Sequence, residues 1–151
     1  MKEFKNITEI LDFAIGEEQA AVDFYLLLAA QSKSPETKKI FQEFAEEEMR
    51  HKANLTKIKE NGALRLSDEK VRDLKITEYL VDVKPSATLS YQDALILAMK
   101  KEKAAFRMYT ALACHAEDPA VKQLFESLAL EESRHKLRFE IEYDDVVFRE
   151  N

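Results

Sequence analysis

The stretch LDFAIGEEQAAVDFYLLLA at residues 11–29 decides the fold, because the chain repeats its pattern as LILAMKKEKAAFRMYTALA at residues 95–113. Each stretch has apolar residues at alternating spacings of four and three, with one carboxylate in the middle of the series. This spacing is typical of the buried face of an α-helix. The pattern predicts two helices that direct Glu18 and Glu102 into the core.

The repeat extends beyond these two stretches. Comparing each position with the one 84 further on gives a correspondence without gaps over about 50 residues. In each half a break that contains proline, SKSP at 32–35 and HAEDP at 115–119, separates two amphipathic segments. Such a break is typical of a helical hairpin. The sequence therefore predicts one domain, residues 1–151, made of two equivalent hairpins at about 6–60 and 90–144.

Each hairpin supplies two helices, and a long segment connects the hairpins. Asn6 and Ser90 occupy equivalent N-cap positions, and Gly62 is the expected C-cap of the second helix. One long crossover, residues 62–89, predicts an all-α, ferritin-like four-helix bundle rather than an up-down-up-down bundle. Residues 68–82 are expected to form either a short helix or an extended segment. The expected helices lie at about 7–31, 36–60, 91–115 and 120–145.

The composition excludes several classes of protein. Only two Gly and three Pro interrupt a sequence rich in helix-forming residues, which favours an all-helical chain. The 29 acidic against 23 basic residues give a net charge of −6, which opposes binding to nucleic acid or to anionic membranes. No apolar run approaches the roughly 20 residues that cross a bilayer, and the start MKEFKNITEI has no signal-peptide core. We therefore expect a cytoplasmic protein.

The second and fourth expected helices each carry a glutamate and a histidine on their apolar seam. The pairs are Glu48 with His51 and Glu132 with His135. Residues three positions apart lie on the same face of a helix, so each pair is expected to point inward. A single such pair is usually a solvated surface pair, whereas here the pair recurs at equivalent positions of the repeat.

The hairpin turns set the level of each buried carboxylate. Glu18 and Glu48 are equally far from position 33, inside SKSP, while Glu102 and Glu132 are equally far from position 117, inside HAEDP. Positions equally far from the turn of an antiparallel hairpin lie side by side. The sequence therefore predicts that all four carboxylates share one layer of the bundle.

Four buried carboxylates need compensating positive charge, and no Lys or Arg occupies the seam. Two divalent cations balance four carboxylates and leave both imidazoles neutral as ligands. Mixed carboxylate and imidazole ligation suits Fe, Mn or Zn. The predicted metal ligands are Glu18, Glu48, His51, Glu102, Glu132 and His135. Their acidic neighbours Glu17, Glu46, Glu47 and Glu131 are interpreted as surface charges.

Three segments carry a resemblance to a known family. EEQAAVDFY at 17–25, EEEMRH at 46–51 and EESRH at 131–135 resemble the rubrerythrin branch of the ferritin-like diiron-carboxylate superfamily, and the resemblance covers nearly the whole chain. It implies a site with two iron ions, each bound by one of the two histidines. It also implies that Glu48 and Glu132 bridge the ions and that the other two predicted carboxylates are terminal ligands.

The resemblance also implies roles for two tyrosines. Tyr25 and Tyr109 match family tyrosines that lie close to the ligand carboxylates, where a phenol can donate a hydrogen bond. The alternative interpretation is a core aromatic whose hydroxyl is satisfied elsewhere. Where many family members have a further carboxylate on the third helix, this chain has Ala105 and Phe106.

The expected function follows from the family. Its diiron centre reacts with hydrogen peroxide or dioxygen, so we expect a diiron peroxidase or oxidase; iron binding or storage without a separate enzymatic role is the alternative. The single cysteine, Cys114, rules out the C-x-x-C pairs of a rubredoxin-type iron site in this sequence. We therefore expect an external electron donor, such as a rubredoxin-type protein, and a homodimer.

Overall fold

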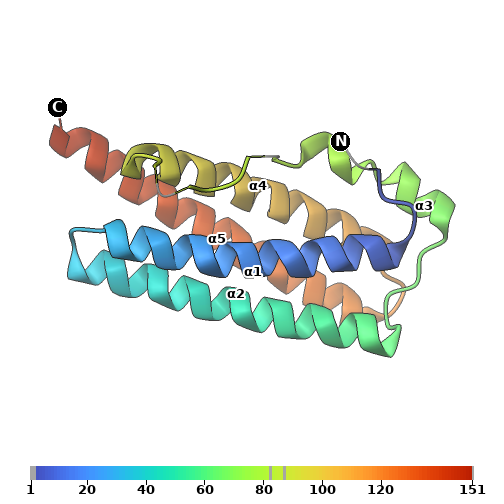
Figure 1. Cartoon of the computed structure of the whole chain (residues 1–151). Helices are drawn as coiled ribbons and strands as arrows, with labels where there is room; N and C mark the ends of the chain where they lie inside the picture. Colours follow the sequence, from blue (N-terminus) through green and yellow to red (C-terminus); the bar gives the residue numbers. More distant parts are fainter. Residues whose placement is uncertain (1–2, 82, 87, 151) are drawn as a thin grey trace.

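The computed structural model describes residues 3–81, 83–86 and 88–150, and these residues contain helices and no strand. None of the described helices is long and apolar enough to cross a membrane. The predicted all-α bundle with one long crossover between its second and third long helices is confirmed (Figure 1). Its elements are α1 (Ile7–Gln31), α2 (Pro35–Asn61), α3 (Asp68–Asp73), the 3-10 helix η1 (Ile76–Tyr79), α4 (Tyr91–His115) and α5 (Pro119–Glu150).

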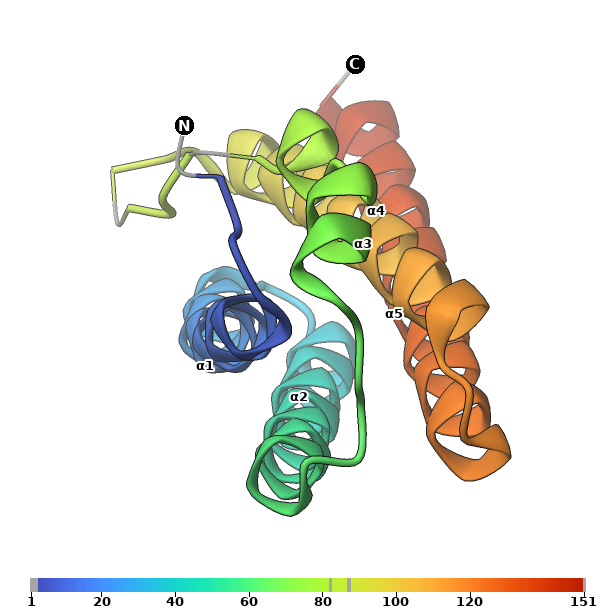
Figure 2. The ribbon, with the colours of Figure 1, turned by 90° about the vertical axis from the view of Figure 1, so that its right-hand side faces the viewer.

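The two hairpins pack against each other. Helix α1 runs along α2, and α4 runs along α5 (Figure 2). The crossover spans the length of the bundle, from the end of α2 to the start of α4, and passes over the side on which α1 and α4 lie (Figures 1 and 2). Helices α2 and α4 therefore start at the same end of the bundle, as the ferritin-like connectivity requires.

Local sequence signals fix most helix ends. The side chain of Asn6 accepts a hydrogen bond from the Glu9 backbone N–H at the start of α1, and Ser90 accepts one from Asp93 at the start of α4. Gly62 ends α2 with a φ of 60°, a left-handed conformation that favours glycine. These three caps are the ones expected from the sequence.

Helix α5 is longer than expected, because it continues past residue 145 to Glu150. No glycine or proline follows Pro119 in the sequence, so nothing stops the helix locally. Val146 is buried and Tyr143 is partly buried against the core, so contacts with the rest of the bundle stabilise this end of the helix.

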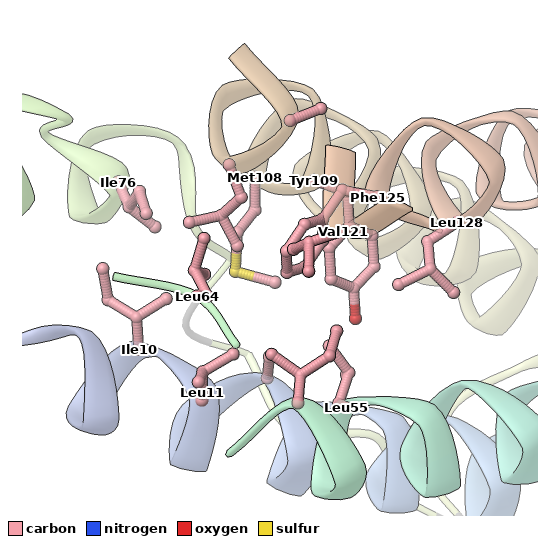
Figure 3. Packing of buried hydrophobic residues seen from close by; sticks show 14 of the residues in the cluster. Ile10, Leu11, Leu55, Leu64, Ile76, Met108, Tyr109, Val121, Phe125 and Leu128 are labelled. Carbon is pink, nitrogen blue, oxygen red and sulfur yellow. The ribbon is translucent and has the colours of Figure 1, made fainter. Parts of the chain in front are cut away.

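The crossover is partly helical, which agrees with the first of the two expected alternatives, a short helix. It contains α3 and η1, with Lys75 in the left-handed conformation between them. Asp82, at the end of the expected segment, lies outside the described residues. Leu64 and Ile76 of the crossover pack onto the bundle beside Leu11 and Met108, as Figure 3 shows. The crossover thus covers one end of the core.

The apolar core consists of two clusters. We call the first the crossover cluster, since it includes Leu64, Val71 and Ile76 together with Leu11, Leu55, Tyr109, Leu112 and Phe125. We call the second the phenylalanine cluster, since it includes Phe24, Phe41 and Phe139 together with Tyr25, Leu28 and Leu95. The repeat relates many members of one cluster to members of the other, for example Leu11 to Leu95 and Phe125 to Phe41. The predicted layer of acidic residues belongs to neither cluster.

A buried polar group lies at the phenylalanine-cluster end of the bundle. Glu142 is 4% exposed and accepts hydrogen bonds from the hydroxyls of Thr37, at 3.3 Å, and Tyr91, at 3.1 Å. Arg149 adds an ion pair with Glu142 at 3.9 Å. These contacts join α2, α4 and α5, and Arg149 belongs to the part of α5 beyond its expected end.

Candidate metal centre

The predicted ligands come from all four long helices and are buried. Helices α1 and α4 contribute one glutamate each, and α2 and α5 contribute a glutamate and a histidine each, as the seam positions predict. None of the six residues is more than 2% exposed. The structure thus brings together Glu18, Glu48, His51, Glu102, Glu132 and His135.

The six residues form two overlapping groups. One group contains Glu18 and His51, the other contains Glu102 and His135, and both contain Glu48 and Glu132. In each group the four ligand atoms lie within 4.8 Å of one another, close enough to hold a metal ion. The two shared carboxylates place the groups side by side. This geometry has the pseudo-twofold symmetry of the sequence repeat.

In both histidines Nδ1 faces the carboxylates. His51 Nδ1 lies 3.2 Å from Glu132 Oε1 and 3.5 Å from Glu18 Oε2. His135 Nδ1 lies 2.9 Å from Glu48 Oε1. A neutral imidazole whose Nε2 carries the proton presents a lone pair at Nδ1, which is the form that binds a metal.

Two further glutamates hold the histidines in this orientation. His51 Nε2–H donates to Glu131 Oε2 at 2.9 Å, and His135 Nε2–H donates to Glu47 Oε2 at 2.5 Å. Each contact crosses between α2 and α5. Carboxylate partners of this kind fix the tautomer and ring orientation of a metal-binding histidine.

The interpretation of Glu47 and Glu131 as surface charges was wrong. Their side chains are 33% and 26% exposed, and each contacts a buried imidazole. Both residues lie off the apolar seam of their own helix, and periodicity within one helix does not reveal a contact made with the opposite helix. A signal was present, because both residues occur at equivalent positions of the repeat, directly before the ligand glutamate. Arg50 lies 3.8 Å from Glu47 and 4.0 Å from Glu131.

The other two acidic neighbours lie nearer the surface. Glu17 is 43% exposed and forms an ion pair with Lys101 at 3.7 Å, and Glu46 is exposed. Glu17 and Lys101 are equivalents in the repeat and meet between α1 and α4. Opposite charges at these two positions avoid the repulsion that identical residues would produce there.

The two tyrosines differ in their contacts. The Tyr109 hydroxyl, on α4, donates a hydrogen bond to Glu18 Oε1, on α1. Tyr25 packs edge-on against His135, with ring centroids 6.2 Å apart, and tilted against Phe139 at 5.0 Å. Tyr109 therefore contacts a predicted ligand carboxylate directly, whereas Tyr25 contacts a predicted ligand through its ring.

The ionisation of the layer reflects burial and crowding of like charges. Burial raises the pKa of Glu18, Glu48 and Glu102, and burial together with the nearby charge of Glu48 raises the pKa of Glu132 to about 8. Burial lowers the pKa of His135, but its contacts with Glu102, Glu47 and Glu48 outweigh burial and raise that pKa to about 12. Protons or metal ions must therefore balance the four carboxylates.

A small cavity adjoins the layer on the side of α1 and α4. Its volume is about 40 Å³, enough for a molecule of a few atoms. The ion pair of Glu17 with Lys101 and Pro85 of the crossover contribute to its lining. The cavity is lined by Glu18, Glu48, Glu102 and Glu132 together with Ala20, Ala21, Phe24 and Tyr25.

Comparison with known proteins agrees with this arrangement. The family model described as rubrerythrin matches residues 9–143, which include all six predicted ligands. Searches of curated proteins and of solved structures gave no match. The family match and the buried Glu and His cluster together indicate a diiron-type metal site. Since the match covers most of the sequence, the chain belongs to the rubrerythrin family.

Proposed function

We propose that this protein binds two iron ions in the buried layer and reduces hydrogen peroxide or dioxygen there. Glu48 and Glu132 would bridge the ions, because they belong to both groups of ligand atoms. Glu18 with His51 would complete one position, and Glu102 with His135 the other. Manganese and zinc suit the same donor set.

The observation that carries this proposal is a set of buried atoms without hydrogen-bond partners. Seven such atoms belong to the six proposed ligands, among them Nδ1 of both histidines and both oxygens of Glu48. When Nε2 carries the proton, Nδ1 is an acceptor like the carboxylate oxygens that it faces, so their close approach forms no hydrogen bond. An unsatisfied buried polar atom costs free energy, and folded proteins contain few of them. Cations satisfy all seven atoms at once, and two divalent ions balance the four carboxylates.

The chain's own residues support a redox reaction with a small oxidant. Two ferrous ions held by these residues would provide the two electrons that, together with two protons, reduce one hydrogen peroxide to two waters. The cavity beside Glu18 and Glu102 admits a molecule of a few atoms and excludes bulky substrates. Tyr109 holds Glu18 through its hydroxyl, and Glu47 and Glu131 hold the two imidazoles. Repeated turnover requires an external electron donor, for which a rubredoxin-type protein is suited.

Anaerobic loading with Fe(II) followed by stopped-flow addition of peroxide tests the proposal. We expect about two iron ions per chain and oxidation faster than that of free Fe(II). The Glu48→Ala variant removes a shared carboxylate and should lose both ions, whereas Glu46→Ala removes an exposed neighbour on the same helix and should behave as wild type. Oxidation no faster than that of free Fe(II) would contradict the redox function and leave binding alone. A many-subunit cage in light scattering would favour iron storage.

A further inference from the structure

An exposed apolar stripe runs along α5. Eight large apolar side chains are exposed among the described residues, and four of them lie on this helix. They are Leu130, Leu137, Ile141 and Phe148, exposed by 51%, 56%, 43% and 85%. Their spacings of seven, four and seven positions place them on one helix face. His135 and Phe139, between them in sequence, are buried, so the stripe points away from the core.

The repeat provides an internal control for this stripe. Three of the four equivalent positions, 84 residues earlier, lie on α2 and are occupied by Glu46, Ala53 and Lys57, which are all exposed. The fourth, Leu64, lies beyond α2 in the crossover and is buried. The apolar face is therefore specific to α5 and is not a by-product of the bundle pattern. An exposed apolar face of this length typically marks an interaction surface.

The stripe is symmetric about the level of residue 139. Leu137 and Ile141 lie two positions to either side of that level, and Leu130 and Phe148 lie nine positions to either side. If two copies of α5 pack antiparallel and cross at this level, Leu137 of each copy meets Ile141 of the other. Leu130 of each copy then meets Phe148 of the other. A twofold axis makes one surface complementary to itself in this way.

Charges beside the stripe have the same symmetry. Arg134 and Asp145 are exposed and eleven positions apart, about three helical turns, so they lie on the same flank of the stripe. Their midpoint lies within one residue of level 139. In the antiparallel arrangement Arg134 of each copy faces Asp145 of the other. The pairing thus gives two ion pairs in addition to the apolar contacts.

A groove between α4 and α5 fits the most exposed side chain of the stripe. It has a volume of about 330 Å³ and is lined by Phe106, Ala113, Ala129 and Leu130, among others. Since Leu130 meets Phe148 of the other copy, that aromatic ring arrives at the groove. An aromatic side chain buries roughly 150–250 Å². The two Phe148 rings supply a substantial part of the roughly 1,000 Å² that a stable interface needs.

We propose that α5 forms the interface of a symmetric homodimer, in which two copies pack antiparallel and Phe148 of each enters the groove beside Leu130 of the other. The surface lies on the outside of the bundle, so the inference does not depend on the reaction at the metal centre.

Sedimentation equilibrium of the full chain tests the interface. We expect wild type at twice 17.5 kDa and Leu137→Glu with a dimer dissociation constant raised roughly 30-fold or more. Leu26→Glu is the matched control, since Leu26 is 48% exposed but lies on α1; it should remain dimeric. Circular dichroism checks that the variants keep their helices. A monomeric wild type, or a dimer that Leu137→Glu leaves intact, would overturn the proposal.

Charge reversal tests the antiparallel register. Arg134→Asp and Asp145→Arg alone should each raise the dissociation constant roughly three- to tenfold. The double variant restores opposite charges and should return to within about twofold of wild type. Failure of the double variant to recover would exclude this register. Cys114 lines the groove, so its reaction with a thiol reagent should slow as the dimer forms and stay fast in Phe148→Glu.

Discussion

The crossover cluster and the phenylalanine cluster come from the same repeat but have diverged. Where the crossover cluster has Leu55, the phenylalanine cluster has Phe139 at the equivalent position, and Leu128 corresponds in the same way to Phe44. The crossover cluster is completed by residues of the crossover. The phenylalanine cluster is completed by larger aromatic side chains from the bundle itself.

The ends of the bundle beyond the clusters have diverged further. At one end the equivalent positions hold Ile7, Ile58 and Val121. At the other end they hold Tyr91, Glu142 and Thr37, and the hydroxyls of Tyr91 and Thr37 both donate to the Glu142 carboxylate. Between these ends, the layer of predicted ligands keeps identical residues in both halves. The comparison indicates that the chemistry of the layer requires the same residues in both halves. The residues at each end of the bundle need only pack closely and pair their polar atoms.

The largest effect is expected from truncating the centre of each cluster. Phe139→Ala should lower the free energy of unfolding by about 3–5 kcal/mol, and Leu55→Ala by about 2–5 kcal/mol, since both side chains are fully buried. Phe139 should cost more, because its ring lies 5.0 Å from Tyr25 and 5.2 Å from Phe41, and aromatic pairs add about 0.5–1.5 kcal/mol. Denaturant unfolding of both variants measures the difference. An equal or larger loss for Leu55→Ala would mean that the aromatic contacts add nothing.

The fold could be predicted because its signals are local and duplicated. Asn6, Ser90 and Gly62 mark helix ends through contacts within a few residues, and the repeat doubles each signal. The end of α5 could not be predicted, since the turn beyond residue 145 depends on the burial of Val146 against distant parts of the chain. The conformation of the crossover likewise depends on contacts of Leu64, Val71 and Ile76 with distant parts of the chain, so local sequence does not determine it.

The level of the candidate site followed from distances to the hairpin turns. Predicting the six ligands required only helix periodicity and the position of each turn, and the structure brings these six residues together. The partners of the imidazoles were missed because Glu47 and Glu131 belong to the seam of neither helix and act across the bundle. A pattern within one helix gives no information about the angle at which another helix approaches.

These imidazole partners provide the next test of how equivalent the halves are. Glu131→Gln should lower the affinity for the ion at His51 by about 10- to 100-fold, because the substitution removes the charge that orients that ring. Glu47→Gln should lower the affinity for the ion at His135 by a similar factor, for the same reason. The pKa of Glu47 is lowered by its hydrogen bond with His135, so this carboxylate stays ionised at neutral pH. Anaerobic titration with Fe(II) should show, in each variant, one iron-binding position with lowered affinity and one with the affinity of wild type.

The control is Glu46→Gln, which neutralises an exposed residue on the same helix as Glu47 and should bind both ions as wild type does. Equal weakening of both ions by either substitution would contradict the assignment of one histidine to each position.

A smaller effect is expected at the polar end of the bundle. Glu142→Ala leaves the hydroxyls of Thr37 and Tyr91 without their buried partner and should cost about 1–3 kcal/mol. Replacing the whole group by apolar residues of similar shape, with Glu142→Met, Thr37→Val and Tyr91→Phe, should be nearly neutral. Thermal or denaturant unfolding distinguishes the two outcomes. A triple variant less stable than Glu142→Ala would show that this end requires its hydrogen bonds.

The smallest effect is expected where the phenylalanine cluster meets the predicted layer. The Phe44 ring stacks on His135, with centroids 4.0 Å apart and planes 27° apart, and the equivalent residue in the other half is Leu128. Phe44→Leu copies that residue, so it should cost less than about 1.5 kcal/mol of stability and change the affinity of the ion at His135 by less than about tenfold. If the two ions bind unequally in wild type and equally in Phe44→Leu, the stacked ring is the cause of their difference. If the inequality remains, the hydrogen bond from Tyr109 to Glu18 is the next asymmetry to remove, and Tyr109→Phe removes it without changing the size of the ring.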